Sequence, residues 1–510
     1  TTTQDTTYNG TVGNVRHSND PFNNIAMESN VITIDGVNVK GDATYRDLGP
    51  TYAPNYQQRN VGLAMGNSLY RWDDLDATAT LANWRKTKNS ESGIINSGTV
   101  DIWGGSKTKA ITGLLVNFGT LKNGNGTTND KGVIRIDHGN ALLGTNGSII
   151  QNLKDSEITV TGKYAPPQKG TAIMRSNETN PNGENYGIAG ISNTGLTDRE
   201  GRAYENSLEI RHDNAKIYVE GDQAVGIYGE NRNAAASSKV TIDFLNDTAI
   251  RTNGIDVRNQ NVSSPDAKGI GIALVNSVAD YTSRANAGGV INLTGGGGIL
   301  GSFAGNGTPG APTGLLLDLG GNDIATGKNG IGIYAEAADI NLNSDNFAVE
   351  TQDNGVGLWG MDDTNVAIGA NHTKKFLYNY KGANDKNGFA MAFGGKHSGN
   401  TTARNDLDIE FTNAGDTAVT LPNEISGVTT GTTKGIAGIL VNTIKAFIKS
   451  ASFPYTFSVL NSNYKCCIFF IKAKILLKFC LRPVCPGMLV ISCLSCSKYM
   501  RQKVIHTAAP

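Results

Sequence analysis

Residues 328–344 read KNGIGIYAEAADINLNS, and this stretch decides the expected fold. A Gly-apolar-Gly-apolar start is followed by strict alternation of apolar and polar residues, which is typical of a half-buried β-strand. The pattern recurs with other residues in GIGIALVN (269–276), GVGLWGMDDTNVAIG (355–369) and VGIYGENRNAAASSKVTIDF (225–244). The chain therefore repeats one structural unit many times.

Alternating strands dominate the sequence up to about residue 444. Each places β-branched or aromatic residues on one face and Thr, Asn, Asp or Lys on the other. One helix is predicted, at 73–88, because DDLDATATLANWRKTK has an acidic start and a basic end. The alternation predicts strands at 30–39, 131–139, 156–162, 206–213, 215–221, 238–244, 288–295, 338–344 and 405–411.

The glycines of the Gly-apolar segments, from Gly187 to Gly435, are spaced 25 to 61 residues apart. Repeats of roughly 20 to 50 residues indicate a solenoid, and irregular spacing indicates that loops of variable length leave the coils. We therefore predict an all-β fold, an elongated right-handed parallel β-helix. Every coil must place small and β-branched residues inside the tube, while the outside is free to vary.

Two different compositions meet near residue 444. The chain has 45 basic and 45 acidic residues, but residues 445–510 contain 10 basic and no acidic ones, all six cysteines and a single glycine. We divide the chain into an irregular N-terminal part with an aromatic-rich insertion (1–95), a β-helical stack (96–444) and a Cys/Lys-rich tail (445–510). The tail is expected to be disordered or irregular and to lie outside the fold, as a frameshift, readthrough or join near 444 would produce.

The Gly-apolar-Gly strands, the Asn/Thr/Gly-rich turns and the cysteine-free acidic stack resemble the passenger domain of a Gram-negative type V autotransporter adhesin, of the large fusobacterial type. The resemblance covers about residues 30–444. It implies export, display at the outer membrane and adhesion to a host cell-surface protein or glycan, or to other bacteria. It also implies that the chain is an internal piece of a longer precursor, which contacts a membrane only through a C-terminal barrel that this chain lacks.

No catalytic, metal or cofactor motif accompanies the strands, and we expect no enzyme activity, no cofactor and no nucleic-acid partner. The run GVGLWG (355–360) matches G-x-G-x-x-G, but a strand and a turn follow it where a dinucleotide site needs a helix, so we assign its glycines to a coil corner. Two alternatives stay open: a β-helical enzyme acting on polysaccharides, and a structural stalk that holds a distal binding domain.

Aromatic residues concentrate in one region of the N-terminal part, together with Pro50 and Pro54. Exposed rings of this kind stack on sugars or anchor protein interfaces, and they are the predicted ligand-binding residues. The alternative is that the rings hold an insertion or cap onto the shaft. The residues concerned are Tyr45, Tyr52, Tyr56, Tyr70, Trp72 and Trp84.

Overall fold

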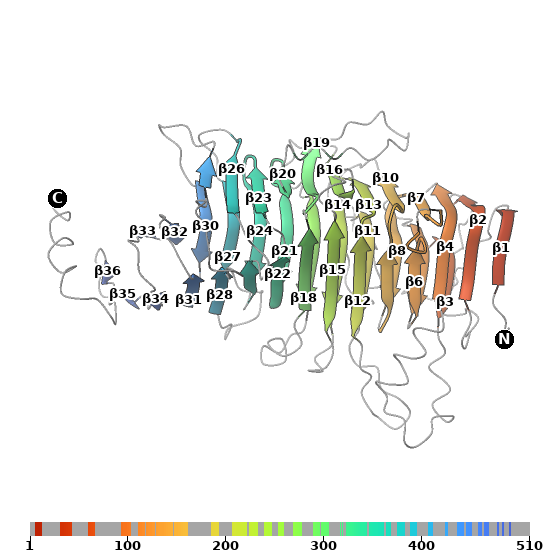
Figure 1. Cartoon of the computed structure of the whole chain (residues 1–510), viewed down its shortest axis with the longest axis horizontal. Coiled ribbons are helices and arrows are strands. Elements are labelled where there is room, and N and C mark those ends of the chain that lie inside the picture. Colours follow the sequence, from red (N-terminus) through yellow and green to blue (C-terminus); the bar gives the residue numbers. More distant parts are fainter. Residues whose placement is uncertain are drawn as a thin grey trace, which may run out of the picture.

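The alternating segments form strands that stack along one axis in the computed structural model, with the first strands of the chain at one end and the last at the other (Figure 1). Side chains are described mainly between residues 93 and 393. The structure describes 6–12, 31–42, 60–66, 93–103, 111–161 without 118, 128 and 146, 185–192, 207–221, 224–232, 239–246, 253–259, 269–277, 289–304 without 296, 317, 319, 323–343, 346–361, 364–368, 375–382, 388–394 and the later strands given below.

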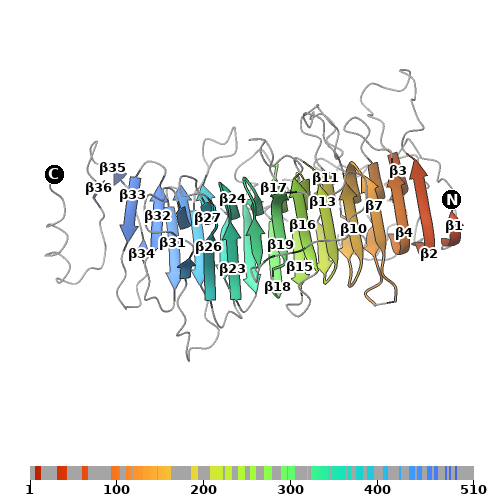
Figure 2. The ribbon, with the colours of Figure 1, turned by 90° about the horizontal axis from the view of Figure 1, so that it is seen from above.

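Three parallel ladders run the length of the stack, and one strand from each makes a coil. The 22-stranded sheet contains ladders one and two, and the 12-stranded sheet contains ladder three together with the antiparallel β33 (Tyr464–Ile468). Figure 2 shows β10, β13, β16 and β19 of ladder two side by side. Ladder one comprises β6 (Thr120–Asn123), β9 (Ile149–Asn152), β12 (Leu208–Asp213), β15 (Val240–Asn246), β18 (Gly289–Gly295), β22 (Ala338–Asn343), β25 (Asn365–Ile368), β28 (Asp406–Phe411) and β31 (Lys445–Ser450).

The other two ladders repeat this arrangement, and the long strands β2 (Val31–Asp42) and β4 (Gly93–Trp103) serve ladders one and two together, next to β1 (Thr6–Val12). Ladder two comprises β7 (Val133–Asp137), β10 (Glu157–Thr161), β13 (Lys216–Glu220), β16 (Gly254–Asn259), β19 (Ile299–Ala304), β20 (Ile324–Thr326), β23 (Asn346–Thr351), β26 (Lys375–Tyr380) and β29 (Glu424–Ser426). Ladder three comprises β3 (Asn60–Gly66), β5 (Ile111–Asn117), β8 (Gly139–Thr145), β11 (Asn185–Ser192), β14 (Ala224–Asn231), β17 (Ile270–Asn276), β21 (Ile331–Glu336), β24 (Gly355–Met361), β27 (Gly388–Gly394), β30 (Ile436–Asn442) and β32 (Phe457–Asn461).

This architecture confirms the predicted all-β solenoid. The nine predicted alternating stretches coincide with β2, β7, β10, β12, β13, β15, β18, β22 and β28. The predicted helix at 73–88 lies outside the described residues. One assignment was wrong: the glycines of 355–360 lie within strand β24 rather than at a coil corner.

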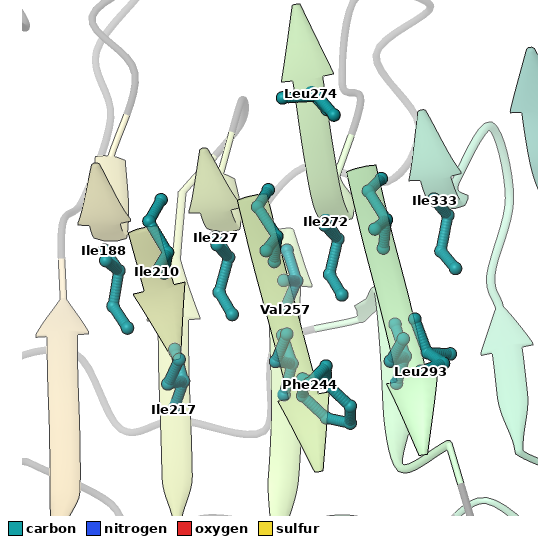
Figure 3. Packing of buried hydrophobic residues seen from close by; sticks show 14 of the residues in the cluster. Ile188, Ile210, Ile217, Ile227, Phe244, Val257, Ile272, Leu274, Leu293 and Ile333 are labelled. Carbon is teal, nitrogen blue, oxygen red and sulfur yellow. The ribbon is translucent and has the colours of Figure 1, made fainter. Parts of the chain in front are cut away.

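One continuous hydrophobic core fills the tube. Ile188, Ile227, Ile272 and Ile333 from four successive strands of ladder three point inward in a row, each without solvent exposure (Figure 3). Side chains of ladders one and two close the tube from the other sides, and the alternation of β12 between buried and exposed residues shows one of these faces. Burying each such side chain contributes about 1.5–3 kcal/mol, so every coil adds a similar increment to the stability.

A column of small residues in ladder three explains the repeated Gly-apolar pattern. A Cβ atom on Gly226 would lie 2.3 Å from Cγ2 of Ile255 and 2.6 Å from the carbonyl oxygen of Gly271. No side chain fits there, because real Cβ atoms do not approach other heavy atoms so closely. The same close approach, at 2.2–2.5 Å to Ile or Val of ladder two, recurs along the column at Gly187, Gly226, Gly271, Gly332 and Gly357.

Ladder two contains one more strand than its neighbours in the middle of the stack. Between β16 and β23 it holds both β19 and β20. At the same levels ladder one holds only β18, between β15 and β22, and ladder three holds only β21, between β17 and β24. The extra strand changes which strand of ladder two faces each glycine of ladder three. Gly226 of β14 faces Ile255 of β16, which follows it in the chain, whereas Gly332 of β21 faces Ile324 of β20, which precedes it.

Parallel stacking extends past residue 444, because β31 pairs with β28 and β32 with β30 in parallel. Beyond β32 the described pairings become antiparallel. They join β33 (Tyr464–Ile468) to β32, β34 (Leu477–Lys478) to β31, and β35 (Arg482–Pro483) to β36 (Leu489–Val490). The change of pairing therefore falls near residue 461, inside the segment that the sequence analysis separates as a tail.

Candidate functional site

The outer faces of the stack differ in chemistry. Ladder one presents a polar outer face, with Glu209, Arg211, Asp243 and Asp339 exposed. Amide side chains bridge its coils: Asn292 donates to Asp243 at 2.7 Å, and Asn341 donates to Asn292 at 2.8 Å. Such hydrogen-bonded polar rows are expected on a solvated sheet face.

Ladder three presents an apolar outer face instead. Its rings and aliphatic side chains form a separate cluster outside the tube, in which Tyr186 and Tyr228 make an edge-to-face contact with centroids 5.0 Å apart. Toward the C-terminal end the face becomes half-exposed, at Ile270, Tyr334 and Trp359. We call these outward side chains of β11, β14, β17, β21 and β24 the outer aromatic face.

Tyr334 and Trp359 lie in the partly exposed part of this face. They are paired across β21 and β24, with ring centroids 5.8 Å apart and planes at 86°. The Tyr334 hydroxyl donates to Oε1 of Glu336 and contacts Sδ of Met361 at 3.1 Å. Because Trp359 lies between Tyr334 and the small Ala392 in the register, it can offer its surface to a ligand.

Tyr228 and Tyr334 are each followed two residues later by a glutamate, in the spacing Tyr-x-Glu. Glu336 is 6% exposed and accepts a hydrogen bond from the Asn276 backbone N–H at 3.3 Å. Glu230 is 1% exposed, and Tyr228 donates to it at 2.8 Å. Each glutamate therefore orients the hydroxyl of the tyrosine two residues before it.

The charge of Glu230 is balanced locally. Arg232 donates two hydrogen bonds to it, from Nε at 2.8 Å and from an Nη atom at 3.0 Å, and the Ser277 hydroxyl donates a third at 2.6 Å. A buried carboxylate is tolerated when it is paired and fully hydrogen-bonded. Glu230 therefore acts as a brace between β14 and the end of β17.

A second outer cluster lies on ladder two. Arg258 donates to the fully buried Asp256 at 2.5 Å, and its guanidinium lies 5.7 Å from the centroid of the Phe303 ring. Leu319, from the segment between β19 and β20, packs near Leu300 in the same region. These contacts hold Leu319 against the outer side of ladder two.

Within the described residues, no group of three His, Cys, Asp or Glu side chains is placed to hold a metal ion. The two strongly perturbed groups point into the tube. Burial lowers the pKa of His212 to about 4, and burial raises the pKa of Tyr378, whose hydroxyl lies 2.8 Å from that of Thr351.

The predicted binding residues Tyr45, Tyr52, Tyr56, Tyr70, Trp72 and Trp84 all lie outside the described residues, so their role stays a prediction. Sequence reasoning missed the outer aromatic face. A signal was present in GIYGE and GIYAE. Because neighbouring residues of a strand point to opposite faces, Tyr228 and Tyr334 point outward when Ile227 and Ile333 point inward.

The fold and this face define a parallel β-helical solenoid with one apolar, partly exposed side. Comparisons with protein families, with curated proteins and with solved structures returned no match. Among the residues that the structure describes, no helix is long and apolar enough to cross a membrane.

Proposed function

We propose that this chain is the shaft of an autotransporter-type adhesin passenger, displayed on the surface of a Gram-negative bacterium and acting by binding rather than by catalysis. The observation that carries the proposal is the half-exposed Tyr334–Trp359 pair on a rigid parallel stack. Aromatic rings held on a rigid support offer large contact area at low entropic cost. The partner is a cell-surface protein or a glycan of a host cell or another bacterium.

Two contact regions follow from this proposal. The first is the set of predicted aromatic residues between 45 and 84, which lie on either side of β3 in the sequence. The outer aromatic face adds a contact along the shaft itself. The solenoid supports both, because each coil is stabilised mainly by its neighbours and insertions between strands do not disturb the rest of the stack.

The experiment is an array of surface glycans and surface proteins probed with the full chain, followed by affinity measurements on any ligand found. Trp359→Ala is expected to weaken binding about 5- to 150-fold, the range for a ring that anchors an interface. Thr294→Ala, on the exposed polar face of β18, is the matched control and should bind normally.

Two results would contradict the proposal. If the chain binds no member of the arrays, the adhesion function fails. If the pure chain turns over a bound polysaccharide, the protein is a glycan-acting enzyme instead.

A further inference from the structure

A directed chain of amides runs through the interior of the first coils. Asn96 Nδ2 donates to Asn123 Oδ1 at 2.8 Å, and Asn123 Nδ2 donates to Asn152 Oδ1 at 2.9 Å. Asn152 Nδ2 then lies 3.4 Å from Nδ1 of His212. All four side chains are fully buried. Since each amide oxygen accepts from the preceding coil, every amide nitrogen points toward the next.

His212 terminates this polar chain. Its ring stacks on Phe244 of the following coil, with centroids 4.7 Å apart and planes at 4°. Beyond Phe244 the column is apolar, with Leu293 and Leu342 at the equivalent positions. His212 therefore lies between coils whose column positions hold hydrogen-bonded asparagines and coils whose column positions hold apolar side chains.

The amide direction selects the protonation state of the ring. Asn152 Nδ2 faces Nδ1, so the neutral tautomer that fits the amide chain accepts at Nδ1 and carries its proton on the buried Nε2. A second proton on Nδ1 would place N–H against N–H₂ and would bury a positive charge. Contact with the Phe244 face offsets only part of that cost.

We propose that His212 makes the coil of β12 an acid-sensitive joint in the shaft: protonation of the ring opens the stack between β9 and β15 before the coils on either side open. The direction of the pKa shift follows from the environment of the ring. Burial lowers the pKa of His212 from 6.5 to about 4, while a backbone hydrogen bond at Ala215 and the charge of Asp213 act in the opposite sense. The neutral ring is thus the folded form.

Other ionisable side chains surround the joint, and a test must separate them from His212. On β12 itself Asp213 is paired with Arg211 at 2.6 Å, and Glu209 is exposed. The adjacent β15 contributes the exposed Asp243, and β9 contributes no ionisable group. The packed strand β13 contributes Lys216, Tyr218 and Glu220, β14 contributes Tyr228 and Glu230, and β11 contributes Tyr186.

The test is hydrogen exchange of the full chain at about pH 7.5 and about pH 4.5, corrected for the intrinsic rates. Protection of β9, β12 and β15 should fall relative to β21, β22 and β24. For a pKa that moves from 6.5 to about 4, the fall is up to roughly 80-fold. His212→Asn, which continues the amide chain and cannot be protonated, should remove this local fall.

The matched control is His138→Asn. His138 lies between β7 and β8 at a φ of 54°, a backbone conformation that Asn tolerates, and its replacement should leave the acid response intact. Two results overturn the proposal: a uniform loss of protection along the wild-type stack, or an unchanged local loss in His212→Asn. If His212→Asn does not fold, the histidine resonances of the wild-type chain decide, and a His212 that titrates near pH 6.5 in the folded chain refutes the joint.

Discussion

A Cβ atom added to Gly332 would lie 2.4 Å from Cγ2 of Ile324, and this contact between ladders three and two decides how tightly the coils close. The carbonyl oxygen of Gly357 would be 2.5 Å away on the other side. A backbone atom cannot move aside as the end of a long side chain can, so only glycine fits at this position.

Gly332→Val is therefore expected to destabilise the stack by about 3 kcal/mol or more, beyond the usual 1–3 kcal/mol for overpacking, because the clash includes a backbone atom. Chemical denaturation measures the change. Thr294→Val introduces the same side chain at an exposed strand position and should change the stability little. Equal stability of the two variants would show that the glycine column is not a packing requirement.

Asn123→Leu interrupts the buried amide chain while keeping the side-chain volume similar. It removes one acceptor of the Asn96 amide nitrogen, which keeps the Val133 carbonyl oxygen at 3.4 Å, and it leaves Asn152 Oδ1 without its donor. An unpaired buried group costs about 1–3 kcal/mol, so we expect a loss of about 1–3 kcal/mol in the free energy of unfolding. Asn125→Leu, at an exposed position two residues on, is the control and should stay within about 0.5 kcal/mol of wild type.

The aromatic segment 45–84 is tested by Tyr52→Ala, Tyr56→Ala and Trp72→Ala. If the rings bind a ligand by stacking, each change weakens adhesion by about 1–3 kcal/mol and leaves the circular dichroism spectrum unchanged. If the rings instead hold an insertion onto the shaft, the same changes lower thermal stability and spare adhesion. Variants that alter neither quantity would leave the segment without either role.

Deletion of 445–510 tests the predicted domain boundary. We expect the thermal unfolding transition of the remaining stack to stay nearly unchanged, because stability in a solenoid is contributed locally and the removed segment meets only the terminal coils. A second deletion, of 462–510, keeps β31 and β32, which pair in parallel with β28 and β30. If the first deletion collapses the fold and the second does not, β31 and β32 form a necessary end of the shaft.

Local pattern identifies the strands of this chain but not their neighbours. Alternation in ADINLN marks β22, yet it does not say that Ile340 lies beside Ile291 and Val366, which are its partners in adjacent coils. Successive coils are joined by loops of different length, so the spacing along the chain does not encode the register. The binding candidates show the same limit, since Tyr334 and Trp359 are 25 residues apart and meet only through the pairing of β21 with β24.

The sequence by itself determined that this protein is an all-β solenoid, because period-two alternation and recurring Gly-apolar segments admit strands with one face in a narrow core. Only the tertiary structure decided where the extra strand β20 enters, which residues share a column, and that His212 joins a polar ladder to Phe244. The physical reason is that coils pair through backbone hydrogen bonds, which any residue except proline can both donate and accept. Register therefore depends on packing between coils, and that packing exists only once the chain is folded.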